Sequence, residues 1–352
     1  MFFLPDASVE SIHRHSKPPT VMTRADFSLL AATLAAETPD SIPWTLPGGA
    51  TARWIDVGAL VIEPAGVASA DLLLSAGVHG NETAPVEVVE AILADLIAGR
   101  LAPSLRLMVL LGNPAALAAG ERYLDYDLNR LFNGAHARHP DAREARRAVQ
   151  LEALATGFFE KAQGRRLHYD LHTAIRGSVF EKFAICPYLD GRKARPDQFA
   201  WLEAAGVEAL LLHSAPASTF TYSTSHRSGA DAFTLELGKA RPFGQNDLSR
   251  FAGIDHALRT LIATGQTDDD ARPDALLGFR AKFDIVKLSD AFRLHLDDAV
   301  ENFTVLPDGM LIAEDGDVRY LAKGGDERIL FPNPKVKNGL RAGIVVEPVA
   351  LV

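Results

Sequence analysis

The sequence has one cysteine, Cys186, in 352 residues. This excludes an intrachain disulfide and fits a reducing compartment, so we expect a cytoplasmic protein. No apolar run is long enough to span a bilayer, because LRLMVLLGNPAALAAG is interrupted by glycine, asparagine and proline. The first residues, MFFLPDASVE, lack the basic start and the long apolar core of a signal peptide. The sequence therefore favours neither a membrane protein nor a secreted one.

The chain also has fewer basic residues than acidic ones. The chain has 36 Lys and Arg against 45 Asp and Glu, which gives a formal net charge of −9. It lacks the global basic footprint of a nucleic-acid-binding protein, so no nucleic-acid partner is expected. An anionic ligand would need local arginines instead of an overall positive field. The length and the 47% hydrophobic content suit a globular protein of one large domain or two.

Strand-like and helix-like patterns alternate from residue 51 to residue 264. Strands are expected over 51–66, 70–78, 104–114, 166–174, 207–215 and 231–239, and helices over 83–99, 141–163, 196–206 and 248–264. This alternation predicts an α/β domain with a largely parallel or mixed sheet, placed at residues 1–265. After the acidic segment TGQTDDDARPDA, short strand-like runs separated by PDGM, EDGD and KGGD predict a small all-β domain over 272–352.

The loop between the strand 70–78 and the helix 83–99 carries His79 and Glu82. Thr83 is a plausible N-cap of that helix, which places the pair at the carboxyl end of the strand. An imidazole and a carboxylate three residues apart on a tight loop can reach one zinc ion. Taken alone, the same pair also occurs on ordinary polar surface loops.

A third ligand is expected at the end of another strand, because catalytic zinc sites have three protein ligands and one open position. His172 in YDLHTAIRGS meets this condition. His168 and Asp170 share its strand face by alternation. Asp170 is a candidate for orienting an imidazole, whereas His168 is better explained as a packed or surface histidine.

Such a site needs a base, and Glu236 in FTLELGK is a charged residue inside an apolar strand. A partly buried glutamate beside a metal suits proton transfer, although the same position also fits a solvated strand face. The segment ERYLDYDLNRLF offers Arg122, Asn129 and Arg130. Arginine binds carboxylates and polarises carbonyls, and the alternative is a surface with ordinary ion pairs.

Together these segments resemble a known family. GVHGNE, DYDLNRLF, DLHTA and TLELGK occur in the order expected of the zinc carboxypeptidase superfamily, and more narrowly of its aspartoacylase/succinylglutamate desuccinylase branch. TLELGKARPFGQNDLSRF and DERILFPNPKVKNGLRAG look like the succinylglutamate desuccinylases of that branch. The resemblance runs from about residue 45 to the end. It implies a carboxypeptidase-like mixed sheet flanked by helices, with a small C-terminal all-β domain.

The resemblance also implies roles for individual residues. His79, Glu82 and His172 would hold one Zn²⁺ per chain, and Glu236 would be the general base. Arg122 would polarise the scissile carbonyl, while Asn129 and Arg130 would grip a substrate carboxylate. For a further substrate carboxylate, the candidate cations are Arg176 and Lys239. No counterpart is found in the β tail for the tyrosine that some relatives place near the substrate.

The implied activity is hydrolysis of N-succinyl-L-glutamate to succinate and L-glutamate, the last step of arginine catabolism through succinylated intermediates. The expected partner is thus a small anionic N-acyl amino acid. One alternative is another N-acyl amino acid deacylase of the aspartoacylase type, or a carboxypeptidase, with the same chemistry and a different pocket. The other is a non-catalytic protein that binds a carboxylated ligand. The sequence does not indicate an oligomeric state.

Overall fold

A computed structural model describes residues 24–268 and 270–351, so the MFFLPDASVE segment lies outside the described residues. Its strands are β1 (Trp44–Thr45), β2 (Thr51–Asp56), β3 (Ala59–Glu63), β4 (Ala70–Ala76), β5 (Arg106–Leu111), β6 (Arg165–Ala174), β7 (Phe183–Cys186), β8 (Ala209–Leu212), β9 (Asp231–Lys239), β10 (Leu277–Val286), β11 (Arg293–Leu294), β12 (Thr304–Val305), β13 (Leu311–Asp315), β14 (Val318–Leu321), β15 (Arg328–Leu330) and β16 (Arg341–Pro348). The α-helices are α1 (Leu29–Leu34), α2 (Thr83–Ile97), α3 (Pro114–Ala119), α4 (Arg143–Phe159), α5 (Pro196–Ala204), α6 (Phe220–Ser228) and α7 (Ala252–Thr264). Short 3-10 helices include η2 (Leu128–Arg130) and η4 (Leu248–Phe251).

Hydrogen bonds join most strands of the described chain into one mixed sheet. Its order is β1-β2-β3-β5-β4-β6-β9-β7-β8-β10-β16-β15-β12. At its centre, β4, β6 and β9 run parallel to one another. These strands are buried along nearly their whole length, as is typical of parallel strands that are covered on both faces. Their carboxyl ends meet at one edge of the sheet, which is where open α/β sheets carry their sites.

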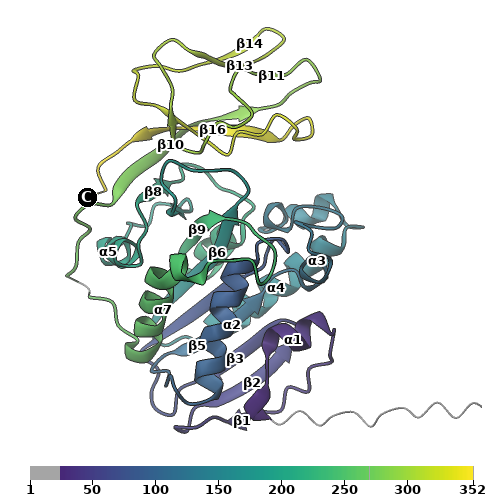
Figure 1. The fold of residues 1–352 in the computed structure, drawn as a ribbon, viewed down its shortest axis with the longest axis vertical. Helices are drawn as coiled ribbons and strands as arrows, with labels where there is room; N and C mark the ends of the chain where they lie inside the picture. Colours follow the sequence, from purple (N-terminus) through teal and green to yellow (C-terminus); the bar gives the residue numbers. More distant parts are fainter. Residues whose placement is uncertain (1–23, 269, 352) are drawn as a thin grey trace, which may run out of the picture.

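Helices cover both faces of the central sheet (Figure 1). One face packs against α1, α2, α5 and α7 through a large apolar cluster that includes Leu93, Leu202 and Leu258. The other face packs against α4 and the start of α6 through a second cluster that includes Phe132 and Phe220. The sheet is thus enclosed between two helical layers, which confirms the predicted α/β class with a mixed sheet flanked by helices.

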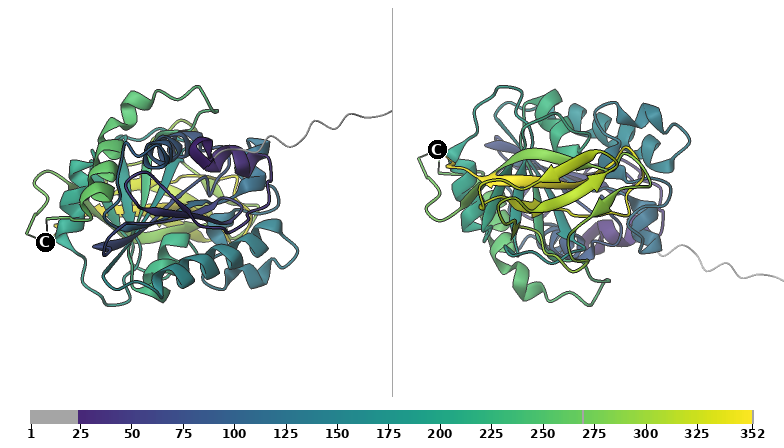
Figure 2. Two further views of the ribbon diagram at one scale, coloured as in Figure 1. Left: turned by 90° about the horizontal axis from the view of Figure 1, so that it is seen from below. Right: turned by 90° about the horizontal axis from the view of Figure 1, so that it is seen from above.

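The C-terminal strands form an all-β unit at one end of the molecule (Figures 1 and 2). This unit is hydrogen-bonded to the main sheet, because β10 pairs in parallel with β8 and in antiparallel with β16. A separate three-stranded sheet, β11-β13-β14, packs over β10 and β16 around Ile285, Ile312 and Val345. The predicted all-β tail is therefore present. The predicted domain limits, 1–265 and 272–352, stay a prediction.

The elements that the sequence did not reveal are short or polar. They include β7, which has four residues, and α6 (FTYSTSHRS), whose buried face is made largely of hydroxyl-bearing side chains. Neither has a clear apolar period, so pattern alone could not identify them. Within residues 24–268 and 270–351, no helix combines the length and the apolar character needed to cross a bilayer.

Candidate active site

The turn after β4 presents His79 and Glu82. The chain reverses at Gly77, which has a φ of +64°, and it then passes very close to α3. A Cβ at Gly80 would lie 2.1 Å from the carbonyl carbon of Ala116, so only glycine fits there. The turn therefore has little freedom, and it fixes the two polar side chains at the carboxyl end of β4.

The expected N-cap at Thr83 is wrong by one residue. Helix α2 begins at Thr83, and Glu82 occupies the N-cap position without a side-chain capping bond. The Thr83 hydroxyl instead donates to the carbonyl of Arg241 at 2.6 Å. The physical reason is that the Glu82 carboxylate is directed away from the helix, toward two histidines and Arg122.

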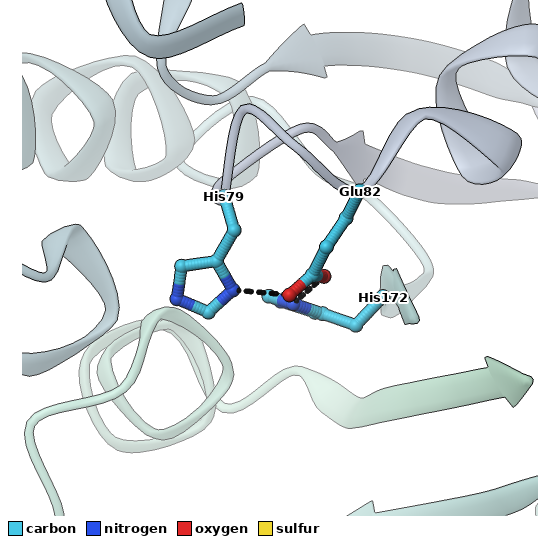
Figure 3. A group of neighbouring side chains, drawn as sticks. All are labelled: His79, Glu82 and His172. Atoms are coloured by element: carbon cyan, nitrogen blue, oxygen red, sulfur yellow. Dashed lines mark hydrogen bonds and ion pairs between the residues drawn. The ribbon is translucent and has the colours of Figure 1, made fainter. Parts of the chain in front are cut away.

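His79, Glu82 and His172 converge on one point (Figure 3). One potential ligand atom from each lies within 4.8 Å of the others, and all three residues are buried. Nδ1 of His79 is 2.8 Å from Oε1 of Glu82, and Nδ1 of His172 is 2.9 Å from Oε2. The structure thus brings together the three residues that the sequence analysis selected as metal ligands.

The other nitrogen of each ring is held by a second carboxylate. Nε2 of His79 lies 2.9 Å from Asp127, and Nε2 of His172 lies 2.9 Å from Asp170. These bonds fix both rings with Nδ1 turned toward Glu82, which is the arrangement that metal-ligating histidines typically have. Two imidazoles and one carboxylate with preset orientations fit a zinc-type metal ion.

The side chains of the cluster shift the pKa values of Glu82 and His172 in opposite directions. Burial alone would raise the pKa of Glu82, but His79 and His172 outweigh it and hold that pKa well below its usual range. Burial would likewise lower the pKa of His172, yet Asp170 and Glu82 raise it well above the ordinary value. The Glu82 carboxylate is therefore ionised, which is the form that binds a metal ion, and each imidazole would bind a metal as the neutral ring.

Glu236 lies beside the cluster on the neighbouring strand. It is in register with His172, since β6 and β9 pair in parallel at these positions. Its side chain is buried, and its Oε2 atom has no hydrogen-bond partner among the described residues. Burial raises the pKa of Glu236 to about 7, with His172 opposing the shift and Glu82 adding to it. A buried carboxyl that ionises near neutrality suits proton transfer.

The three residues selected from ERYLDYDLNRLF differ in their contacts with this centre. Arg122 donates from Nη1 to Oε1 of Glu82 at 2.8 Å, so it reaches the metal-binding group directly. Asn129 is buried, and its Oδ1 accepts the N–H of Phe220 at 2.9 Å, which leaves its NH₂ group as the donor for a ligand. Arg130 is exposed and donates to the carbonyl of Asn129 at 2.8 Å. No contact in the described chain joins Arg130 to the metal-binding residues.

A buried polar chain continues behind the cluster. Asp170 accepts a hydrogen bond from Ser75, and the Ser75 hydroxyl lies 2.9 Å from Nε2 of His168. Nδ1 of His168 in turn lies 2.7 Å from the Thr224 hydroxyl. Burial lowers the pKa of His168 to about 4, so its ring is neutral at pH 7. His168 is thus a packed histidine, as expected, and it supports Asp170 behind the candidate ligand His172.

Asp127 is the site residue that sequence reasoning missed. It caps η2 by accepting the N–H of Asn129, and the same carboxylate orients His79. Its pKa is held well below the usual range, because His79 and Arg130 outweigh the effect of burial. The available signal was its place in DYDLNR, two residues before Asn129. Nothing in the local pattern distinguished it from Asp125.

Comparisons with known proteins agree with this geometry. Residues 68–262 match the family described as the succinylglutamate desuccinylase/aspartoacylase catalytic domain, and residues 274–349 match the AstE/AspA barrel-sandwich hybrid domain. A curated succinylglutamate desuccinylase of Chromobacterium violaceum is 62% identical over 310 residues, covering 88% of this chain and 93% of its own length. One of Pseudomonas aeruginosa is 48% identical over 327 residues, covering 92% and 98%.

The fold comparison gives the same answer. The crystal structure of a succinylglutamate desuccinylase from Chromobacterium violaceum superimposes with a TM-score of 0.84 at 57% sequence identity, covering 92% of this chain and 98% of that one. Both domain matches, two relatives of high identity and a close structural neighbour thus agree. The chain belongs to the succinylglutamate desuccinylase/aspartoacylase family.

Proposed function

We propose that this protein hydrolyses N-succinyl-L-glutamate to succinate and L-glutamate, as a step of arginine catabolism. The observation that carries the proposal is the placement of an unpartnered, buried Glu236 carboxylate beside a buried His–Glu–His group. This pairing of a metal-binding group with a proton acceptor suits hydrolysis of an amide. Two relatives, 62% and 48% identical, are succinylglutamate desuccinylases, which supports the choice of substrate.

The metal ion is proposed to be zinc, one per chain, held by Nδ1 of His79, Nδ1 of His172 and the Glu82 carboxylate. A bound zinc ion supplies Lewis acidity, which makes a nearby water acidic and withdraws electron density from a carbonyl oxygen. Asp127 and Asp170 hold the two imidazoles with Nδ1 toward Glu82, and they would keep these atoms directed at the ion. Three protein ligands leave a coordination position for water or substrate.

Glu236 is proposed as the general base. Its carboxylate takes a proton from the attacking water as the water oxygen bonds to the amide carbon. The C–N bond then breaks, and Glu236 returns that proton to the leaving nitrogen. The new carboxylic acid then loses its proton to the amine, so one amide and one water give one carboxylate and one ammonium group. The pKa of about 7 suits a group that must both accept and release a proton near neutral pH.

Arg122 and the Asn129–Arg130 pair are proposed to position the substrate. Arg122 lies beside Glu82, where its guanidinium can donate to the amide carbonyl as negative charge develops on that oxygen. The NH₂ group of Asn129 and the guanidinium of Arg130 can hold one substrate carboxylate. This fixes the distance between that carboxylate and the scissile amide. The cytoplasmic location expected from the sequence stays a prediction.

A substrate panel tests the proposal. The purified protein, analysed for metal, is given N-succinyl-L-glutamate, N-acetyl-L-aspartate and N-succinyl-L-arginine, and the released acid is measured. We expect strong turnover of N-succinyl-L-glutamate that a chelator abolishes, and little turnover of the other two. Metal-dependent activity on another of these substrates would keep the mechanism and refute the substrate. Protein that binds no zinc when zinc is supplied, and that hydrolyses none of them, would refute the function.

A further inference from the structure

The proposed substrate has three carboxylates, and the Asn129–Arg130 pair accounts for one. The two cations considered from the sequence do not form a built second subsite. Arg176 donates to the backbone carbonyls of Asp298 and Val300, so it ties the loop after β6 to the β tail. Lys239 is exposed at the end of β9, and its side chain forms no hydrogen bond or ion pair with any described residue.

A better-defined cation comes from the β tail itself. Arg341 begins β16, opposite Val286 of β10. Its Nη1 atom lies 3.3 Å from Nε2 of His213, which directly follows β8. The nearest carboxylate oxygen is Oδ1 of Asp284, at 3.5 Å, on a side chain that is 46% exposed. The guanidinium is thus held at the junction between the main sheet and the β tail.

The loop from His213 leads directly to the Asn129–Arg130 pair. Residues 213–219 join β8 to α6. Near the end of this loop, the carbonyl of Ser218 accepts the N–H of Phe132, and the N–H of Phe220 donates to Oδ1 of Asn129. Residues 125–126, 138–142 and 337–340 line a cavity of about 780 Å³, which brings the segment before Asn129 next to the segment before Arg341. Arg341 directly follows this last segment.

Two guanidinium groups, those of Arg341 and Arg130, lie near each other at this junction. Burial lowers the pKa of Arg341 to about 10, and Arg130 is close enough to contribute to that shift. Burial, together with the charge of Arg341, lowers the pKa of His213 to about 4, so His213 is neutral at pH 7 and its Nε2 can accept from Arg341. Asp284 is the carboxylate near Arg341, and Asp127 is the one near Arg130. A guanidinium has five N–H donors, so both groups keep donors for a further carboxylate.

We propose that Arg341, oriented by His213, binds the side-chain carboxylate of the substrate's glutamate, next to the carboxylate held by Asn129 and Arg130. The two carboxylates of the glutamate lie on the same side of the scissile amide and only a few bonds apart, so neighbouring arginines can hold both. The succinyl carboxylate lies on the other side of the amide. This assignment rests on the proposed function, and it makes the β tail part of the substrate pocket.

The test compares two substrates that differ only at that carboxylate, N-succinyl-L-glutamate and N-succinyl-L-glutamine. For the full-length, zinc-loaded enzyme, Arg341→Gln should lower kcat/KM for the glutamate substrate about 10- to 100-fold, mainly through KM. The same variant should change kcat/KM for the glutamine substrate less than about threefold. Arg341→Lys should recover part of the loss. Arg280→Gln removes another arginine of this sheet, one paired with Glu347, and serves as the matched control.

Inhibition by product gives an independent measurement. The inhibition constant of L-glutamate should rise about tenfold or more in Arg341→Gln, whereas that of L-glutamine should not change. Two outcomes would overturn the subsite: equal losses on both substrates in Arg341→Gln, or a glutamate-selective loss in Lys239→Gln and none in Arg341→Gln. In either case, wild-type activity on N-succinyl-L-glutamate would leave the proposed function standing. A wild-type enzyme that releases succinate from neither substrate would overturn both.

Discussion

The role of Glu236 gives the sharpest mutational prediction. Glu236→Gln keeps the size of the side chain and removes its ability to accept a proton. The Oε2 atom of its side chain has no hydrogen-bond partner among the described residues, and Glu236 is not one of the three converging ligands. The substitution should therefore leave the fold and the metal content nearly unchanged while it removes the base.

The expected magnitudes follow from this position. General base catalysis by a placed side chain is worth about 10²- to 10⁴-fold, so kcat should fall by that factor. The carboxyl is buried and its pKa is raised to about 7, which shows that its charged form is not favoured by its surroundings. Replacing it with a neutral amide should change the free energy of unfolding by no more than about 1 kcal/mol.

The assay measures succinate release at saturating N-succinyl-L-glutamate, with zinc content and thermal melting recorded on the same samples. Glu63→Gln is the control, because Glu63 is an exposed glutamate at the end of β3. Loss of bound zinc in Glu236→Gln would show that the residue is a ligand and not the base. A fall in kcat smaller than about tenfold, with full zinc content, would refute the proton-transfer role.

Three further predictions concern the metal ligands and the fold. His172→Ala should lose zinc and activity together, and full activity in metal-analysed protein would remove His172 from the site. Asp127→Asn should weaken zinc affinity about 10- to 100-fold because His79 loses its orienting carboxylate, which a competition titration with a chelator would measure. Burial would raise the pKa of Asp197, but hydrogen bonds from two arginines lower it to about 2. This pKa lies below the value in the unfolded chain, so the ionised Asp197 stabilises the folded state. That stabilisation is fully present above about pH 4 and is lost as the pH falls through about 2. Asp197→Asn should therefore cost about 2 kcal/mol in denaturant unfolding at pH 7 and progressively less below pH 4; an unchanged cost at pH 3 would contradict this.

Most of the main sheet could be predicted from sequence because its strands and helices have strong, different apolar periods. The run RLHYDLHTA gave β6, and the pattern after Thr83 gave α2. The prediction failed where burial depends on partners far along the chain. Helix α6 buries hydroxyl side chains such as Thr221 and Thr224, which form hydrogen bonds to other elements. The local sequence pattern does not predict that this helix is buried.

The centre of the site was predictable for a different reason. His79, Glu82 and His172 stand at the ends of recognisable parallel strands, and topology alone brings such ends together. Asp127 and Arg341 were missed because their positions are set by tertiary contacts. Asp127 reaches His79 across 48 positions, and Arg341 reaches His213 across 128. Contacts between residues so far apart in the chain cannot be predicted from local motif spacing.

The central claim is that one zinc ion at His79, Glu82 and His172 is required for hydrolysis of N-succinyl-L-glutamate. The most direct test removes metal from the purified protein with a chelator and then titrates zinc back while succinate release is measured. The account predicts no activity in the metal-free protein and full recovery at one zinc per chain. Activity that survives complete removal of metal would contradict it.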